Sequence, residues 1–206
     1  TFSIIVVAVL ISIDLLGKIY TNWGESFRHS IFQVVSLATT TGFATTDTTI
    51  WPTLSIILLI LISFQCACSG STGGGIKADR VFVFFKMLSR QTIQLQHPQA
   101  VVPVKINNHI VDDDILGSIL LFIVFYIVIV VVSTVFLAIF GQDLMTAFSA
   151  SLASVSNIGP GFGQVGSMAN YFEIDGASKL VLSIGMLLGR LEIYGLLLLF
   201  MFHSWK

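Results

Sequence analysis

Two short polar turns lie between apolar segments of this chain, and their residue types suit the binding of a cation. The first turn is Thr40-Thr41-Gly42-Phe43, and the second turn is Asn157-Ile158-Gly159-Pro160. Non-helical backbone at membrane depth survives only where protein buries it or where it lines a water-filled cavity. Rings of carbonyl oxygens can replace the hydration shell of a monovalent cation, and glycine permits the positive φ that turns a carbonyl inward. We therefore interpret both turns as selectivity-filter segments, with the cation at the carbonyls of Thr40, Thr41, Gly42, Asn157, Ile158 and Gly159.

A glycine-rich segment is the first candidate for a gate. Four of the six residues in Gly70-Ser71-Thr72-Gly73-Gly74-Gly75 are glycine, and each costs a helix about 1 kcal/mol relative to alanine. The segment therefore predicts a broken helix. A phosphate-binding loop would continue as Gly-Lys-Ser/Thr after a strand, whereas this segment continues as Ile76-Lys77 after a long apolar run. We favour a flexible plug, because a loop without large side chains can lie across a pore and move aside.

Arg190 is the second candidate for a gate. A charge at the bilayer centre costs between about 2.5 and 17 kcal/mol, so such a residue normally faces a cavity or a partner. We predict that Arg190 faces the ion path below the filter as an electrostatic barrier. The alternative is that Arg190 lies near the cytoplasmic end of its helix and extends its side chain to the interface. Its position 16 residues before Lys206, roughly 24 Å along a helix, argues against that alternative.

The composition indicates an integral membrane protein. Of the 206 residues, 55% are hydrophobic and only 10% are charged, whereas a soluble domain carries about a quarter charged residues. The net charge of −1 and the lack of a basic patch exclude nucleic-acid binding. We therefore expect membrane lipid to surround the apolar segments of the protein. The apolar segments contain no paired nucleophile and base and no cluster of metal ligands, so we predict no enzymatic activity and no organic cofactor.

The apolar pattern predicts the helices that must hold these residues in place. The chain opens at Thr1 inside the apolar run Phe2–Ile13, which we interpret as the end of a spanning helix that is truncated here. Glu25–Leu37 and Asp143–Ser156 are amphipathic and too short to cross a hydrocarbon core about 30 Å thick. The other predicted helical runs are Thr53–Ala67, Leu116–Phe140 and Ala177–Trp205.

The distribution of charge predicts the orientation in the membrane. The loop 141–176 contains three acidic residues and no lysine or arginine. Cytoplasmic loops carry an excess of lysine and arginine. We therefore predict a multi-pass protein in which residues 91–115 form a cytoplasmic linker. The basic residues near the predicted cytoplasmic side are Lys77, Arg80, Lys86, Arg90, Lys105 and Lys206.

A single offset relates the two halves of the chain. Shifting the sequence by 117 places Gly42 on Gly159 and Thr40 on Asn157. It also places Gly73 opposite Arg190, which predicts that the two gate candidates lie at one depth. Either turn alone is compatible with a simple chain reversal that caps a helix, but two turns at matching places favour a pore. The predicted fold is an all-α membrane protein with two consecutive helix–pore-helix–filter–helix repeats, at 1–90 and 116–206.

In combination, these motifs resemble the TrkH/KtrB branch of the superfamily of K⁺ transporters. The matching pieces are Thr39–Phe43, Gly70–Lys77, Asn157–Gly161 and Gly189–Glu192. The Gly-Pro-Gly of the second turn resembles TrkH more than KtrB. The resemblance covers essentially the whole chain and implies the third and fourth of four repeats around a pseudo-fourfold pore.

The resemblance also implies a function and partners. It implies K⁺ uptake across the bacterial inner membrane with some Na⁺ permeability, with K⁺ at the two filter turns and gating by Gly70–Gly75 and Arg190. It implies a homodimer regulated by a cytoplasmic nucleotide-binding ring of the TrkA type. Two alternatives remain open: a related K⁺/Na⁺ transporter of the KtrB/HKT type, and a non-conducting membrane scaffold.

Overall fold

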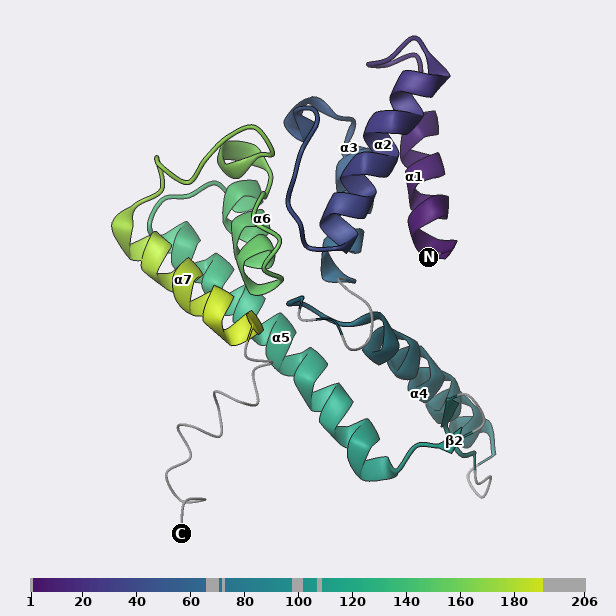
Figure 1. Ribbon diagram of the computed structural model, residues 1–206. Coiled ribbons are helices and arrows are strands. Elements are labelled where there is room, and N and C mark those ends of the chain that lie inside the picture. The colour runs from purple at the N-terminus through teal and green to yellow at the C-terminus, as the bar shows by residue number, and fades with distance from the viewer. Residues whose placement is uncertain (1, 66–70, 72, 98–101, 107–108, 191–206) are drawn as a thin grey trace.

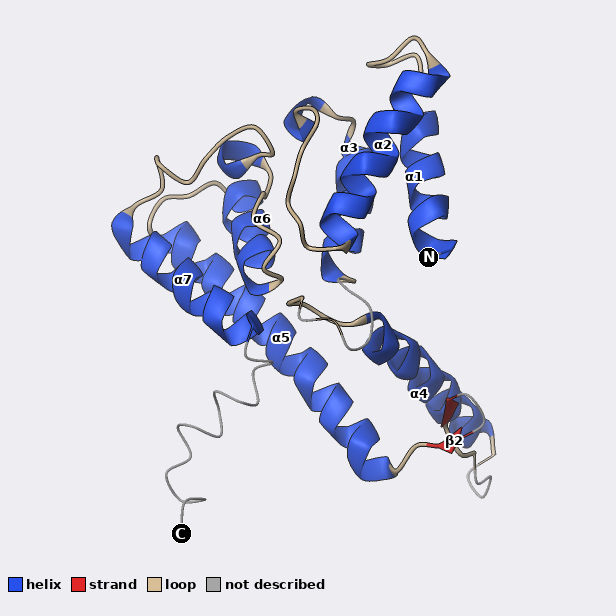
Figure 2. Ribbon diagram, in the orientation of Figure 1, coloured by secondary structure: helices blue, strands red, loops and turns tan. Residues whose placement is uncertain are grey.

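The computed structural model describes residues 2–65, 71, 73–97, 102–106 and 109–190. This part of the chain is mostly helical (Figure 2). Its α-helices are α1 Phe2–Leu15, α2 Trp23–Ala38, α3 Thr53–Phe64, α4 Ala78–Gln96, α5 Asp113–Ile139, α6 Leu144–Val155 and α7 Gly176–Arg190. The short elements are the 3-10 helices η1 Thr48–Ile50 and η2 Gly163–Val165 and the antiparallel strands β1 Lys105–Ile106 and β2 His109–Ile110.

The helices form two groups of three (Figure 1). Helices α1, α2 and α3 contact one another in the first group, and α5, α6 and α7 contact one another in the second. Helix α3 also contacts α6, which joins the groups, and α4 packs against α5. In each group a short helix, α2 or α6, leads into one of the two polar turns.

The two short helices begin in the same way. The side chain of Asn22 accepts a hydrogen bond from the backbone N–H of Gly24 before α2, and Asp143 caps α6 through the N–H of Met145. Such caps satisfy backbone donors that a helix leaves unpaired at its start. With 16 and 12 residues, the helices are about 24 and 18 Å long. Both are shorter than a bilayer core of about 30 Å.

Helix α5 is the one described helix long and apolar enough to cross a membrane by length and composition. Helices α1, α3 and α6 are apolar but shorter. Only 28% of the most apolar window of α5 is buried, and residues such as Val131 and Val135 are each 52% exposed. An apolar surface of this extent is rare in water and ordinary in lipid. This surface agrees with the predicted membrane class.

The segment between the two groups departs from the predicted linker at 91–115. Helix α4 continues to Gln96, because no proline or glycine interrupts residues 91–96. Helix α5 begins at Asp113, three residues before the predicted start, where acidic residues favour a helix N-terminus. The carboxylate of Asp113 also accepts a hydrogen bond of 2.6 Å from Arg90. The small β1–β2 ladder is the exception to the all-α prediction.

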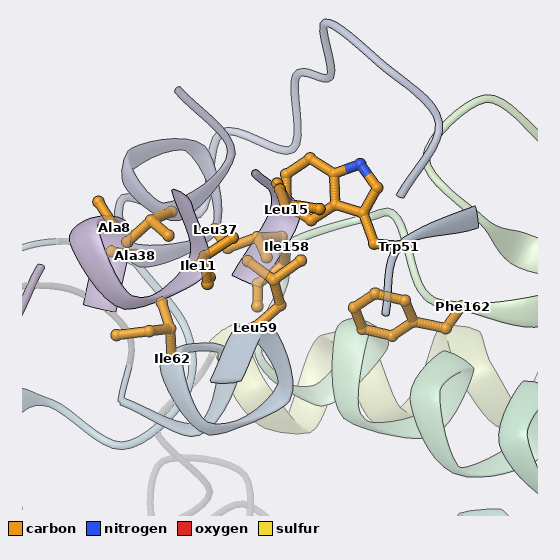
Figure 3. Packing of buried hydrophobic residues seen from close by; sticks show 11 residues of the cluster. Ala8, Ile11, Leu15, Leu37, Ala38, Trp51, Leu59, Ile62, Ile158 and Phe162 are labelled. Carbon is orange, nitrogen blue, oxygen red and sulfur yellow. The ribbon is translucent and has the colours of Figure 1, made fainter. Parts of the chain in front are cut away.

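The core of the first group includes side chains from the second turn. Leu15, Leu37 and Leu59 are buried in this cluster. Figure 3 shows Ile158 beside Leu37 and above Leu59, with Phe162 below Trp51. Because Ile158 is 96% buried there, the core of the first group also fixes the second turn. The buried members of the cluster are Ala8, Ile11, Leu15, Val34, Leu37, Ala38, Trp51, Leu59, Ile62, Ile158 and Phe162.

Candidate functional site: two polar turns and the glycine segment

The first and second turns have the same backbone pattern. Thr40 and Asn157 both have φ of 56°, and they are the non-glycine residues with positive φ in the described part of the chain. Gly42 and Gly159 follow with φ of 72° and 106°. Positive φ is uncommon outside glycine. The offset of 117 therefore relates two turns of like conformation as well as like sequence.

The two turns lie in direct contact. A Cβ atom added to Gly42 would be 2.2 Å from the carbonyl oxygen of Ile158 and 2.9 Å from Cδ of Pro160. The backbone of the first turn therefore approaches the second turn more closely than any residue with a side chain would permit. The structure thus brings three of the predicted filter residues into direct contact: Gly42, Ile158 and Pro160.

The first turn is supported from within its own helix. The Ser36 hydroxyl donates a hydrogen bond of 2.6 Å to the Phe43 carbonyl, and the backbone N–H of Thr41 donates to the Ser36 carbonyl at 3.0 Å. The Phe43 side chain is 71% exposed. It is one of the residues that line a groove of about 510 Å³ beside α2: Arg28, Ile31, Phe32, Val35, Ser36, Thr39, Thr41 and Phe43.

The second turn is supported from outside its helix. The side-chain amide Nδ2 of Asn157 donates to the Met186 carbonyl of α7 at 3.1 Å. The Tyr171 hydroxyl, from the loop after η2, donates to the Gly159 carbonyl at 2.6 Å. A carbonyl oxygen has two lone pairs, so Gly159 keeps a second one. The backbone N–H of Ile158 also donates to the Ala153 carbonyl of α6 at 2.9 Å, as the N–H of Thr41 does to Ser36 in the first turn. The two turns therefore share a backbone conformation and a hydrogen bond to their own helix, and they differ in their side-chain supports.

The glycine segment passes next to the second turn. Ser71, Gly73, Gly74 and Gly75 are described, whereas Gly70 and Thr72 lie outside the described residues. A Cβ on Gly74 would be 2.8 Å from Nδ2 of Asn157 and 2.8 Å from the Ser156 carbonyl oxygen. Gln65 and Ile76 form a parallel bridge, so these two residues on either side of the segment lie side by side. Gly74 thus lies against the base of the second turn.

Arg190 is the last residue of α7, and its side chain is exposed. Its neighbour Gly189 packs on the end of α6, because a Cβ there would be 1.8 Å from the Val155 carbonyl oxygen and 3.0 Å from Nδ2 of Asn157. The sequence offset pairs Gly73 with Arg190. In the structure, the residues adjacent to this pair, Gly74 and Gly189, both approach the side-chain amide nitrogen Nδ2 of Asn157.

A buried hydroxyl joins the two groups beside this point. The Ser156 hydroxyl is 2.6 Å from the Tyr126 hydroxyl of α5 and donates to the Ser63 carbonyl of α3 at 3.1 Å. Tyr126 and Ser156 are fully buried. The residue just before the second turn, Ser156, therefore contacts both groups.

Comparison with known proteins identifies the family. Residues 5–205 match the profile of TrkH, described as a cation transport protein. The chain belongs to the TrkH family. The resemblance predicted from the motifs is thereby confirmed, and membership of a transport family agrees with the prediction that the chain is not an enzyme.

Relatives in the TrkH family match over most of this chain. The Trk system potassium uptake protein TrkH of Halomonas elongata is 37% identical over 182 residues, which is 88% of this chain and 37% of that protein. Its counterpart in Escherichia coli is 34% identical over 205 residues, covering 100% of this chain and 42% of that protein. The crystal structure of the potassium transporter TrkH from Vibrio parahaemolyticus superposes with a TM-score of 0.90 at 33% identity, over 100% of this chain and 44% of that one. The chain spans less than half the length of these TrkH relatives.

Several residues of the candidate site were not singled out in the sequence. Gly185 and Gly189 form a G-x-x-x-G pattern in an apolar helix, a signal of close helix packing that could have been found. Tyr171 and Ser167 carry no such signal, because a lone tyrosine or serine in a loop predicts nothing about its partner. Tyr171 bonds to Gly159, 12 residues away, and Ser167 bonds to residues about 120 positions away, so their roles depend on contacts made outside their own local segments.

Ser167 connects the outer loops of the two groups, and its removal gives the first prediction. Its hydroxyl donates to the Thr46 carbonyl at 3.0 Å and accepts from the backbone N–H of Thr48 at 3.0 Å. Thr48 is 99% buried, so Ser167→Ala leaves that N–H without its partner. We expect a loss of about 1–2 kcal/mol of stability, seen as a lower melting temperature of the detergent-solubilised full-length protein.

Ser89→Ala is the matched control for Ser167→Ala. The Ser89 hydroxyl bonds only to the Phe85 carbonyl one turn earlier on the exposed surface of α4, so its removal should leave the melting temperature unchanged. Equal melting temperatures for both variants would contradict a connecting role for Ser167.

Proposed function

We propose that the protein takes up K⁺ across the bacterial inner membrane through a filter lined by backbone carbonyls. The observation that supports this most is the contact between two turns of matching conformation, with positive φ at Thr40, Gly42, Asn157 and Gly159. In such a filter, K⁺ is held by the carbonyls of Thr40, Thr41, Gly42, Asn157, Ile158 and Gly159, with Phe43 and Pro160 completing the two turns. K⁺ is the cargo, and the proposal involves no organic cofactor.

In this proposal, the two turns supply half of the ring of filter segments that surrounds the cation. A ring that surrounds a cation needs about four such segments. The TrkH-family relatives are more than twice as long as this chain, which supports placing the other segments outside these 206 residues. The two helix–pore-helix–filter–helix units then serve as consecutive quarters of a pseudo-fourfold pore.

The gate in this proposal consists of Gly70–Gly75 and Arg190. The approach of Gly74 and Gly189 to the same amide of Asn157 supports a gate close to the base of the second turn. The glycine segment blocks the path in one position and opens it in another. Arg190 adds an electrostatic barrier against cations.

Removing the charge of Arg190 gives the second prediction. Arg190→Ala should raise the rate of K⁺ flux, because the barrier to a cation falls when the fixed positive charge is lost. A change of about tenfold corresponds to about 1.4 kcal/mol, which is less than the cost of a charge at the bilayer centre. Arg190→Lys keeps the charge and is the control, with flux near that of the wild type. Unchanged or lower flux in a folded Arg190→Ala protein would contradict the barrier role.

The proposal extends to location and partners. The family relationship supports a multi-pass protein surrounded by lipid, with residues 91–115 on the cytoplasmic side. By resemblance, the working unit is a homodimer in which each subunit has its own pore. A TrkA-type cytoplasmic ring that binds nucleotides regulates it.

Ion flux into liposomes tests the proposed function directly. The full-length protein is reconstituted, and uptake of K⁺ or Rb⁺ is followed against an equal gradient of Na⁺. We expect uptake of K⁺ and Rb⁺ well above that of Na⁺. Equal uptake of Na⁺ would favour the alternative of a K⁺/Na⁺ transporter of the KtrB/HKT type. The absence of any cation flux would overturn the proposal in favour of a scaffold.

A further inference from the structure

We propose that Tyr171 is a positioning residue for the second turn: its hydroxyl sets the orientation of the Gly159 carbonyl and thereby contributes to the preference for K⁺ over Na⁺. The inference rests on the proposed function, because it assigns this carbonyl to the ion path. Tyr171 itself does not touch the ion.

The hydrogen bond connects the turn to a rigid part of the structure. The Tyr171 hydroxyl lies 2.6 Å from the Gly159 carbonyl oxygen, across 12 residues of sequence. The tyrosine ring packs against the buried core of the second group, which consists of Leu137, Ala147, Ala150, Val165, Ile174 and Leu182. The backbone N–H of Ile174 donates to the Tyr171 carbonyl at 3.3 Å and closes the local turn. The hydroxyl is therefore held by side chains from α5, α6 and α7.

The direction of this hydrogen bond does not change near neutral pH. Burial raises the pKa of Tyr171 to about 12, above its ordinary value of 10. The hydroxyl therefore keeps its proton and donates to the carbonyl under all physiological conditions. The second lone pair of the carbonyl oxygen remains for another partner, which is the K⁺ ion in the proposed filter.

Gly159 needs such a support more than Gly42 does. A Cβ on Gly159 would meet nothing within 4 Å, whereas a Cβ on Gly42 would meet the Ile158 carbonyl oxygen at 2.2 Å. Glycine with positive φ and open space around it can change its backbone angles at little cost. Close packing restrains the peptide of Gly42, and the Tyr171 hydroxyl takes that role for Gly159.

Tyr171→Phe in the full-length protein tests the inference. Phenylalanine keeps the packed ring and removes the donor. One hydrogen bond contributes about 0.5–1.5 kcal/mol, so we expect the ratio of K⁺ to Na⁺ uptake to fall by roughly 2- to 10-fold. A residue that only stabilises the fold would change the amount of active protein and leave this ratio unchanged.

Tyr20→Phe is the matched control. The Tyr20 hydroxyl is also near an outer loop, but it bonds to the Thr46 hydroxyl at 3.3 Å and reaches no carbonyl of either turn. Its removal should leave the ratio unchanged. A wild-type ratio in Tyr171→Phe would overturn the inference and leave the proposed function intact. A wild-type protein that conducts no cation would instead overturn the proposed function.

A second variant covers the case in which Tyr171→Phe does not fold. Difluorotyrosine at position 171 keeps both the ring and the hydroxyl but makes the hydroxyl more acidic. The ratio of K⁺ to Na⁺ uptake should then become dependent on pH in the alkaline range, as the donor loses its proton. A ratio that stays at the wild-type value across that range would count against the inference.

Discussion

Replacing Gly42 by alanine should reduce K⁺ uptake by roughly 100-fold, the equivalent of about 3 kcal/mol. Two costs combine at this position. A residue with a side chain at φ of 72° is strained by about 1–3 kcal/mol. The new methyl group would also lie 2.2 Å from the Ile158 carbonyl oxygen, which is a backbone atom and cannot rotate away. The two turns must then separate, and the proposed ring of carbonyls loses its geometry. The measurement is the initial rate of K⁺ uptake per inserted protein in liposomes.

Gly141→Ala separates the two costs of Gly42→Ala. Gly141 has φ of 85°, but a Cβ there would meet nothing within 4 Å. This variant therefore carries the backbone strain without the collision and should keep most of the uptake. Comparable losses in the two variants, or wild-type uptake by Gly42→Ala, would contradict the close contact of the turns as the cause.

Replacing Gly189 by alanine should have the second-largest effect. A Cβ at this position would lie 1.8 Å from the Val155 carbonyl oxygen and 2.8 Å from its carbonyl carbon. A Cβ on Gly185, one turn earlier, would lie 3.4 Å from Cγ2 of Val155, which is an ordinary contact. Helices that pack through small residues separate when a methyl group is inserted. We expect a loss of about 2–3 kcal/mol, measured as a lower melting temperature of the full-length protein in detergent.

Gly117→Ala is the control for Gly189→Ala. Gly117 lies in α5, and a Cβ there would meet nothing within 4 Å. In a helix, alanine is more favourable than glycine by about 1 kcal/mol, so the melting temperature of this variant should equal or exceed that of the wild type. If the Gly189→Ala variant had the same melting temperature as the wild type, the packing of α7 on α6 through Gly189 would be refuted.

The sequence was sufficient to predict most elements that show a strong local signal. The uninterrupted apolar run of α5 and the short amphipathic helices α2 and α6 were located to within three residues. Gly42 and Gly159 were predicted to need positive φ, and they have it. In each case the residue type acts through its own backbone or through the period of its helix, so neighbouring sequence contains the information.

Other features depend on residues that meet only after folding. The contact between Gly74 and Asn157 joins segments 83 residues apart, and nothing in either segment predicts the other. The Tyr171 and Ser167 hydrogen bonds are of the same kind. The apolar run predicted at Thr53–Ala67 gives a helix that ends at Phe64, with Gln65 bridged to Ile76 and residues 66–67 outside the described residues. The ion-binding and gating roles themselves stay predictions until flux is measured.

The unequal support of the two turns has a consequence for how motion spreads through the molecule. Each turn is tied by a backbone hydrogen bond to the helix that leads into it, from Thr41 to Ser36 of α2 and from Ile158 to Ala153 of α6, and the first turn is also held by the Ser36 hydroxyl of α2. The second turn is attached to α7 through Asn157 and to the outer loop through Tyr171. A displacement that begins in α7 therefore reaches the second turn before the first. The two turns repeat in sequence pattern, but they differ in how they are coupled to the rest of the structure.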